Sequence, residues 1–232
     1  MTTPIEAVFV DLAGALARSD TSARAFAELS DDGSESTHRA IARHLREVTA
    51  AYALSAANMT NRSDWTLGRE GLSRKKGYNC PEDYVQALGG GGGGGTKADT
   101  RRLIEAGTMA TEAEAARDRQ EQADVLALEH PEAPPVEVHR PWFAPLGDAV
   151  TDGTLSAEAA TAIRRGLGEV AIGVTEEMLA DAVVALIAQC RILNADQAAK
   201  AARHCRDSID AAGIASRADA MRARQYLRAS TG

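Results

Sequence analysis

The residues that first suggest chemistry are seven consecutive glycines, Gly89–Gly95, followed by Thr96 and Lys97. Such a run matches the GxGxxG pattern of a dinucleotide-binding loop, but that loop must follow a strand and open a helix. The preceding residues, Pro81–Leu88, have the sequence of a helix, and the Gly-Lys-Ser/Thr order of a P-loop is absent. We therefore expect a flexible connector, and a phosphate held at the helix N-terminus at Thr96 is the alternative.

The histidines, cysteines and serines form no recognisable catalytic or metal-binding pattern. The five histidines belong to no HExxH motif, the three cysteines to no CxxC pair, and no GxSxG sequence marks a nucleophilic serine. Arg203–Asp207 and Arg206–Asp210 have the i,i+4 spacing of ion pairs on a helix surface. We predict no catalytic residue, no metal site and no cofactor, and we expect the chain to be inert toward DNA when metal ions are added.

Two basic clusters are the remaining candidates for binding. The chain has 33 acidic and 26 basic residues, a net charge of −7, which argues against a surface that is basic throughout but leaves room for a local basic face. We expect contact with nucleic acid, DNA above all, to come from these clusters, and solvated helix faces are the alternative. The first cluster is Arg69, Arg74, Lys75 and Lys76. The second, on the last predicted helix, is Arg217, Arg222, Arg224 and Arg228.

The composition predicts that helices position these residues, in an all-α fold. Hydrophobic residues make up 44% of the chain and aromatic residues only 4%, and a core of small and aliphatic side chains favours helices over strands. Apolar residues with helical spacing from Ile5 to Leu16 predict a first helix. Residues 19–36 are expected to form a loop, and Ser36 is expected to cap a long helix that reaches about Thr60.

Glycines and prolines predict the next helix boundaries. Pro81 opens a short helix, and Thr96 begins another that we expect to stop at Gly107. Residues 111–129 are expected to be helical. Four prolines between residues 130 and 141 exclude a continuous helix there and predict a linker.

The last third of the chain has the clearest helix caps, at Ser156, Thr175, Asn194 and Ser216, with a stop at Gly213. Together these signals predict two helical lobes joined by a Pro-rich connector. The expected boundaries are 1–110 for the N-terminal helical lobe, 111–141 for an acidic helix and the linker, and 142–232 for the C-terminal helical lobe.

Cysteine usage and hydropathy predict a cytoplasmic protein. Three scattered cysteines do not suit a disulfide scaffold, so a reducing compartment is expected. No stretch is long and apolar enough to span a bilayer, and the N-terminus lacks the basic start of a signal peptide. We expect no membrane partner, and the oligomeric state stays open.

Three groups of motifs occur together. The first is Arg62-Ser63, Leu67-Gly68-Arg69-Glu70-Gly71-Leu72, Gly77-Tyr78 and Pro81. The second is Leu146-Gly147-Asp148-Ala149-Val150 and Gly153-Thr154-Leu155-Ser156-Ala157-Glu158-Ala159. The third is Asn194-Ala195-Asp196, Ala202-Arg203, Arg206-Asp207, Asp210, Gly213-Ile214 and Arg217. In this order they resemble the actinobacterial family called domain of unknown function 222, also known as the 13E12 repeat family, over about residues 36–228.

The resemblance implies a helical domain that precedes a C-terminal HNH endonuclease domain, which hydrolyses phosphodiesters with a metal ion and a histidine base. This chain stops at Gly232, about where that domain is expected to begin, so nuclease activity is not carried over to it. The leading expectation is a non-catalytic accessory domain that helps to position an HNH-type nuclease on nucleic acid. The alternatives are a protein-interaction or oligomerisation module, and a truncated remnant of a nuclease-like protein.

Overall fold

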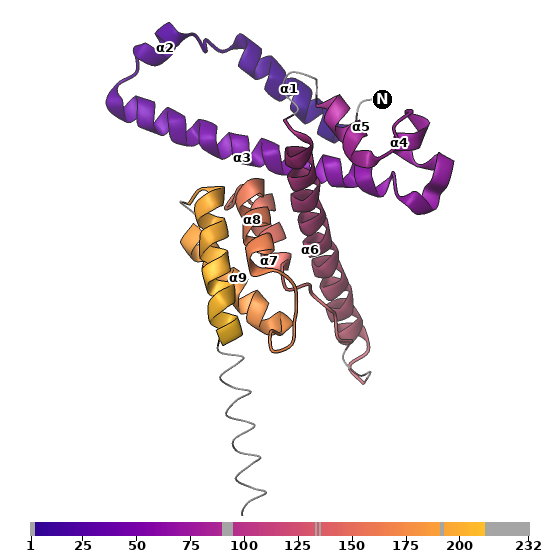
Figure 1. Cartoon of the computed structure of the whole chain (residues 1–232). Coiled ribbons are helices and arrows are strands. Elements are labelled where there is room, and N and C mark those ends of the chain that lie inside the picture. Colours follow the sequence, from indigo (N-terminus) through magenta and orange to yellow (C-terminus); the bar gives the residue numbers. More distant parts are fainter. Residues whose placement is uncertain (1–2, 90–94, 133, 135, 191–192, 212–232) are drawn as a thin grey trace, which may run out of the picture. The chain divides into compact units, whose positions relative to one another are not determined.

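The structure, a computed structural model, describes residues 3–89, 95–132, 134, 136–190 and 193–211 (Figure 1). These residues form helices and irregular segments, and no strand occurs among them, so the fold is all-α as predicted. The helices of the first half are α1 (Pro4–Arg18), α2 (Ala23–Ala27), α3 (Asp31–Asn61), the 3₁₀ helix η1 (Trp65–Glu70), α4 (Leu72–Lys75) and α5 (Pro81–Leu88). Those of the second half are α6 (Lys97–Glu129), α7 (Ala144–Thr151), α8 (Ala157–Leu167), α9 (Glu176–Cys190) and residues 195–211.

Contacts divide the chain into two compact units, Met1–Leu45 and Arg46–Gly232. We call them the N-terminal unit and the main unit. The division falls inside α3 and not near residues 110 or 141, where the sequence predicted boundaries. Residues 110 and 111 both lie inside α6, and the helices after the Pro-rich segment pack onto α6, so the helices on either side of that segment share one core.

In the N-terminal unit, the prediction of a loop over residues 19–36 was wrong. Ser22 caps α2, because its hydroxyl accepts a hydrogen bond from the amide of Ala25. The next helix begins at Asp31, and the Ser30 hydroxyl accepts from the amide of Gly33 at its start. Ser36, the predicted cap, lies inside α3, where its hydroxyl donates to the carbonyl of Gly33. Acidic side chains in the first turn favour this earlier start.

In the main unit, the prediction that a helix stops at Gly107 was also wrong, because α6 continues through it to Glu129. A Cβ at Gly107 would lie 1.9 Å from the carbonyl oxygen of Ala53 on α3, well inside van der Waals contact. The glycine therefore permits two helices to cross with their backbones touching. Gly147 does the same where α7 meets α6, because its Cβ would lie 2.4 Å from the oxygen of Met109.

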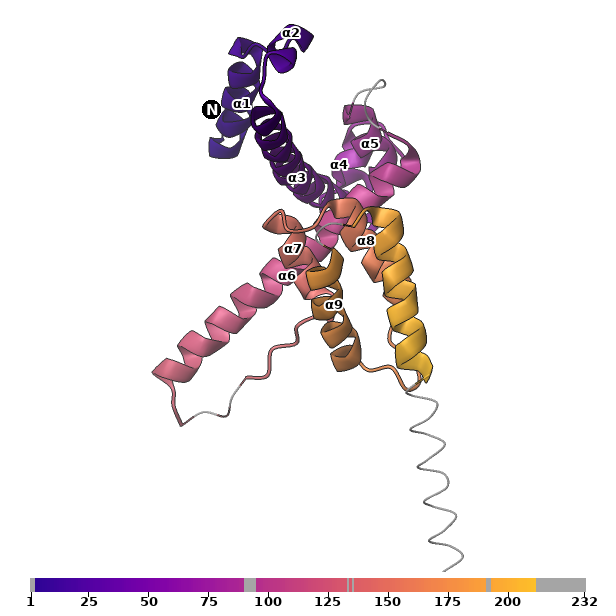
Figure 2. The ribbon, with the colours of Figure 1, turned by 90° about the vertical axis from the view of Figure 1, so that its left-hand side faces the viewer.

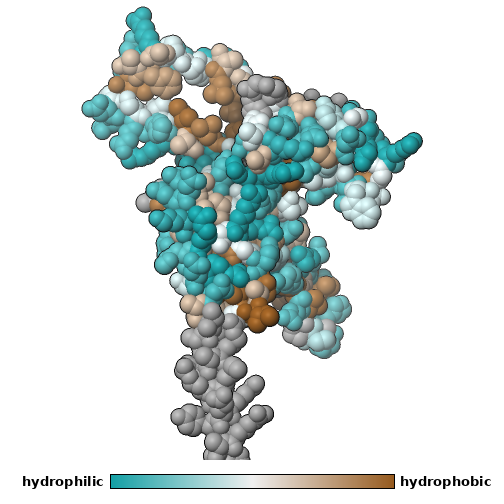
Figure 3. All heavy atoms as spheres, viewed as in Figure 1, coloured by the Kyte–Doolittle hydropathy of each residue, from teal (hydrophilic) through white to brown (hydrophobic). Residues whose placement is uncertain are grey.

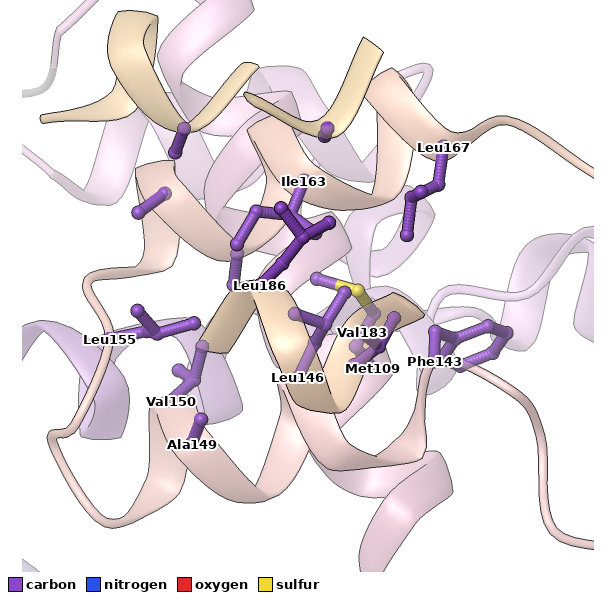
Figure 4. Close-up of a cluster of buried hydrophobic side chains, with 14 of the residues drawn as sticks. Met109, Phe143, Leu146, Ala149, Val150, Leu155, Ile163, Leu167, Val183 and Leu186 are labelled. Carbon is purple, nitrogen blue, oxygen red and sulfur yellow. The ribbon is translucent and has the colours of Figure 1, made fainter. Parts of the chain in front are cut away.

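The core of the main unit lies among α6, α7, α8, α9 and the helix at residues 195–211. Figure 4 shows Met109, Leu146, Ile163 and Val183 converging from four of these helices, and each is fully buried. More than half of the buried hydrophobic residues among the described residues are alanines, which lets helices approach closely. The T-shaped contact of Trp142 with Phe143, with ring centroids 5.5 Å apart, is part of the same cluster.

Most of the predicted caps are present. Thr96 and Asp99 form a reciprocal capping box, Ser156 accepts from the amide of Ala159, and Thr175 accepts from the amide of Met178. Asn194 and Gln197 bond to each other's amides in the same way. The segment after α6 is not helical in its described residues, as its prolines predicted. The predicted stop at Gly213 and the cap at Ser216 lie outside the described residues.

None of the helices in the described part of the chain has the length and apolar character needed to cross a membrane.

Candidate nucleic-acid interface

The first motif group forms a small basic lobe, residues 61–79, between the end of α3 and the start of α5 (Figure 1). Glycines set its turns. Gly68 has φ +52° and ψ −123° inside η1, and Gly77 has φ +84° after α4, so both positions suit glycine best. Five Arg or Lys residues and two acidic residues lie in these 19 positions, a net charge of +3 in a chain whose total is −7.

Buried hydrogen bonds hold the lobe against the end of α3. The hydroxyl of Ser63 donates to the carbonyl of Met59 at 2.7 Å and accepts from the amide of Ser73 at 3.0 Å. Ser63 and Ser73 are 7% and 1% exposed, so this serine link joins α3 to α4 away from water. The amide of Leu72 donates to the carbonyl of Arg62 at 2.8 Å beside it. The short helices therefore have fixed positions although they are too short to be stable alone.

The lobe surrounds a hollow of about 560 Å³. Trp65, at its edge, is 87% exposed, which is unusual for the largest apolar side chain and leaves an indole face open to solvent. The lining is otherwise polar and basic, with two arginines and two asparagine side chains. The residues that line the hollow are Thr60, Asn61, Ser63, Asp64, Trp65, Gly68, Arg69, Ser73, Arg74, Asn79 and Pro81.

Most of the cations in this lobe are available for a ligand. Lys75 pairs with Glu70 at 2.8 Å, and that contact holds the pKa of the Glu70 carboxyl below its usual value. Within the described part of the chain, Arg69, Arg74 and Lys76 have no acidic side chain within ion-pair distance, and all three are exposed. The basic charge of the lobe is therefore largely uncompensated.

The acid that lines the hollow is already engaged. Asp64 accepts hydrogen bonds from the hydroxyl of Thr66 at 2.5 Å and from its amide at 2.8 Å. These bonds hold the pKa of the Asp64 carboxyl below its ordinary value, so it is ionised near neutral pH while it caps η1. Its position fixes the start of the helix that carries Trp65.

This arrangement can bind a polyanion that also carries flat rings. Arginine and lysine contact phosphates, and an exposed indole stacks on a base without reading its sequence. Exposed tryptophan and arginine are equally typical of protein interfaces, which the sequence analysis kept as an alternative. The charge pattern of the sequence indicated Arg69, Arg74, Lys75 and Lys76 but gave no weight to Trp65. Its position between Asp64 and Thr66, away from any apolar stripe, was the available signal.

The second motif group serves packing and capping. Leu146 is fully buried, and Asp148 pairs with Arg140 at 2.7 Å and with Arg117 at 3.5 Å. Those pairs join α7 to the Pro-rich segment and to α6. Gly153 has φ +72°, and its carbonyl accepts a hydrogen bond from Arg46 on α3.

The third motif group is also structural where it is described. Arg206 pairs with Asp210, as the spacing predicted. The pair is not a simple surface ion pair, because the side chain of Arg206 is only 18% exposed. Its guanidinium donates to the carbonyls of Leu167 and Glu169 at 2.6 and 2.7 Å, which satisfies the C-terminal end of α8. Arg203 and Asp207 do not pair among the described contacts. The first group differs in that its exposed side chains include several cations and a tryptophan beside one hollow.

The other predicted binding residues cannot be placed beside the lobe. Arg217, Arg222, Arg224 and Arg228 lie outside the described residues, as do glycines 90–94 of the glycine run. Of the glycines at its ends, Gly89 is the C-cap of α5 and Gly95 has φ +65° before α6. Among the described residues no group of three or more His, Cys, Asp or Glu side chains is placed to hold a metal ion.

No protein-family model, curated protein or solved structure matches the chain. The resemblance to the domain of unknown function 222 family therefore rests on the motifs alone and stays a prediction.

Proposed function

We propose that this chain is a non-catalytic helical accessory domain that contacts nucleic acid through its basic lobe and helps to position an HNH-type nuclease there. One observation carries the nucleic-acid part: an 87% exposed Trp65 stands beside a hollow lined by Arg69 and Arg74, cations with no acidic partner among the described residues. The nuclease part is supported by the motif resemblance.

Binding of this kind has a calculable salt dependence. Three uncompensated cations, Arg69, Arg74 and Lys76, release about three counterions when they reach phosphates. For a single strand this corresponds to a slope of about −2 in log K against log salt concentration. Affinity is then modest and independent of sequence, because phosphate contacts and stacking read no base edges. A single strand is the preferred ligand, since its unpaired bases can reach the indole.

The experiment is fluorescence anisotropy of a labelled single-stranded oligonucleotide, titrated with the full chain across a salt series. Arg69→Gln with Arg74→Gln is expected to weaken binding at least tenfold and to flatten the slope by about 1.4. Arg101→Gln with Arg119→Gln is the matched control. It removes the same charge from exposed positions on α6, and binding is expected to change less than threefold.

The second basic cluster provides a further comparison. If Arg224→Glu with Arg228→Glu abolishes binding while the Arg69 and Arg74 double variant binds normally, the contact belongs to the C-terminal cluster and our assignment to the lobe fails. If the wild-type chain does not bind even at low salt, the nucleic-acid role fails altogether. Circular dichroism of each variant is the folding control.

A protein-interaction or oligomerisation module is the second candidate function. The N-terminal unit favours it, because that unit leaves large apolar side chains exposed.

A further inference from the structure

The N-terminal unit has no interior. Among its described residues, 3–45, not one is buried. All four buried residues of α3 lie beyond Leu45, in the main unit. Yet α1 has a full capping box at Thr3 and an apolar stripe, and the chain turns back at α2 so that α1 and the first part of α3 run in opposite directions (Figures 1 and 2). The unit has well-formed helices without the core that normally stabilises them.

The exposed side chains of this unit are large and apolar. On α1 one face carries Ile5, Val8, Phe9, Leu12 and Leu16, which are 38–65% exposed. Phe26 and Leu29 at α2, with Ile41 and Leu45 on α3, are 38–62% exposed. In Figure 3 brown, apolar atoms border an open space within this part of the molecule. We call these nine residues the apolar arm surface.

The size of the apolar arm surface matches one half of a dimer interface. From the exposures of its nine members, it leaves about 900 Å² of apolar side chain in contact with water. A standard interface buries about 800 Å² on each partner, so two copies of this surface would bury about 1,800 Å² in total. A monomer rarely exposes a contiguous apolar patch much larger than a few hundred Å².

Two helices cannot enclose a core, but four can. The pair made by α1 and the first part of α3 supplies two roughly antiparallel helices: α1 carries an apolar stripe along its length, and α3 contributes Ile41 and Leu45 at the end of this part. A second copy related by a two-fold axis supplies two more, which completes a four-helix arrangement in which the same surface of each copy packs against the other. No other component is needed to bury the stripe on α1.

Charge argues against the other occupants of such a surface. Residues 1–45 hold seven acidic and four basic side chains, a net charge of −3. An amphipathic helix that lies on an anionic membrane has Lys and Arg on its polar face, whereas Glu6 and Asp11 flank the stripe on α1. Nucleic acid is repelled by the same charge. A partner that presents an apolar face, as a second copy does, fits best.

We propose that the N-terminal unit is a homodimerisation arm, in which the apolar arm surfaces of two copies pack against each other. The interface is distinct from the basic lobe, which lies in the main unit. It also responds to salt in the opposite direction. Salt screens the repulsion between two arms of charge −3 and strengthens apolar association, whereas it weakens phosphate contacts. The two proposals can therefore fail separately.

The test is sedimentation velocity of the full chain from about 1 to 100 μM, a range that brackets micromolar dimerisation. Val8→Gln with Leu12→Gln is expected to raise the dimer dissociation constant about 100-fold, because a symmetric interface contains each change twice. Val10→Gln is the matched control. Val10 lies on the same helix with a similar exposure of 65% but off the stripe, and its substitution is expected to change dimerisation less than threefold.

A wild-type chain that is monomeric at the highest concentration overturns the proposal, and so does a dimer that both variants weaken equally or that neither weakens. Because Val8 and Leu12 are exposed, their substitution leaves the main unit folded, which a thermal melt of each variant verifies. Raising the salt concentration is expected to tighten the wild-type dimer, and clear weakening by salt also counts against an apolar interface.

Discussion

Replacing Gly107 with alanine tests the way in which α6 crosses α3. The new methyl group would lie 1.9 Å from the carbonyl oxygen of Ala53, 2.4 Å from its carbonyl carbon and 2.9 Å from the Cβ of Ala57. Two of these atoms are backbone and cannot rotate away. Because an ordinary contact is at least 3.4 Å, the two helices must separate by roughly 1.5 Å.

The cost combines strain with lost packing. Overpacking a core costs about 1–3 kcal/mol and occasionally more, and separating the helices also uncovers neighbouring buried alanines such as Ala106 and Ala110. Alanine regains about 1 kcal/mol through its higher helix propensity. We expect a net loss of about 3 kcal/mol in the free energy of unfolding, which for a unit of this size lowers the melting temperature by about 10 °C.

The assay is thermal unfolding followed by circular dichroism, with Gly14→Ala as the control. At Gly14, on α1, the nearest atoms to a new Cβ belong to the flexible end of the Arg18 side chain, at 3.1 Å. That variant is expected to leave the melting temperature unchanged or slightly raised. A Gly107→Ala protein that melts within 2 °C of the wild type would refute the close backbone crossing, since propensity alone moves stability by only about 1 kcal/mol.

Three further predictions concern the supports of the fold. Ser63→Ala leaves the buried amide of Ser73 without its acceptor, so a urea titration is expected to show a loss of about 1–3 kcal/mol in the free energy of unfolding. An unchanged unfolding midpoint would contradict the serine link. Arg206→Met removes the donors to the carbonyl of Leu167, and the same assay is expected to show a loss of about 2 kcal/mol in the free energy of unfolding; Arg119→Met, at an exposed position of α6, is the comparison that changes little. Burial raises the pKa of the Cys190 thiol, which keeps the nucleophilic thiolate scarce at neutral pH. A disulfide reagent is therefore expected to modify Cys190 only after denaturant is added, and rapid reaction in the folded protein would show that the site opens.

The helix content was predictable because local signals determine it. The capping box at Thr96, the cap at Ser156 and the reciprocal pair of Asn194 with Gln197 each satisfy amides within their own first turn. Such bonds require no knowledge of the rest of the fold. The break after α6 was predictable for the same reason, since proline excludes a helix wherever it falls.

The failures came from interactions across the chain or from competing local caps. Gly107 resembles a helix stop in sequence, and only the proximity of Ala53, 54 positions earlier, explains a glycine inside a continuous helix. Ser36 resembles a cap, but Ser30 and two aspartates start the helix sooner. Trp65 was missed because exposure depends on where the lobe leaves its side chain, which residue type alone does not indicate.

The fluorescence of Trp65 during titration with a single-stranded oligonucleotide tests whether the basic lobe binds nucleic acid. The chain has two tryptophans, and the second, Trp142, is 4% exposed in the core, so a stacked base can reach only Trp65. Our account predicts saturable quenching at low salt that added salt reverses and that Trp65→Phe removes. Binding detected by anisotropy with no quenching of Trp65, or no binding at low salt, would contradict the assignment of the basic lobe as a nucleic-acid interface.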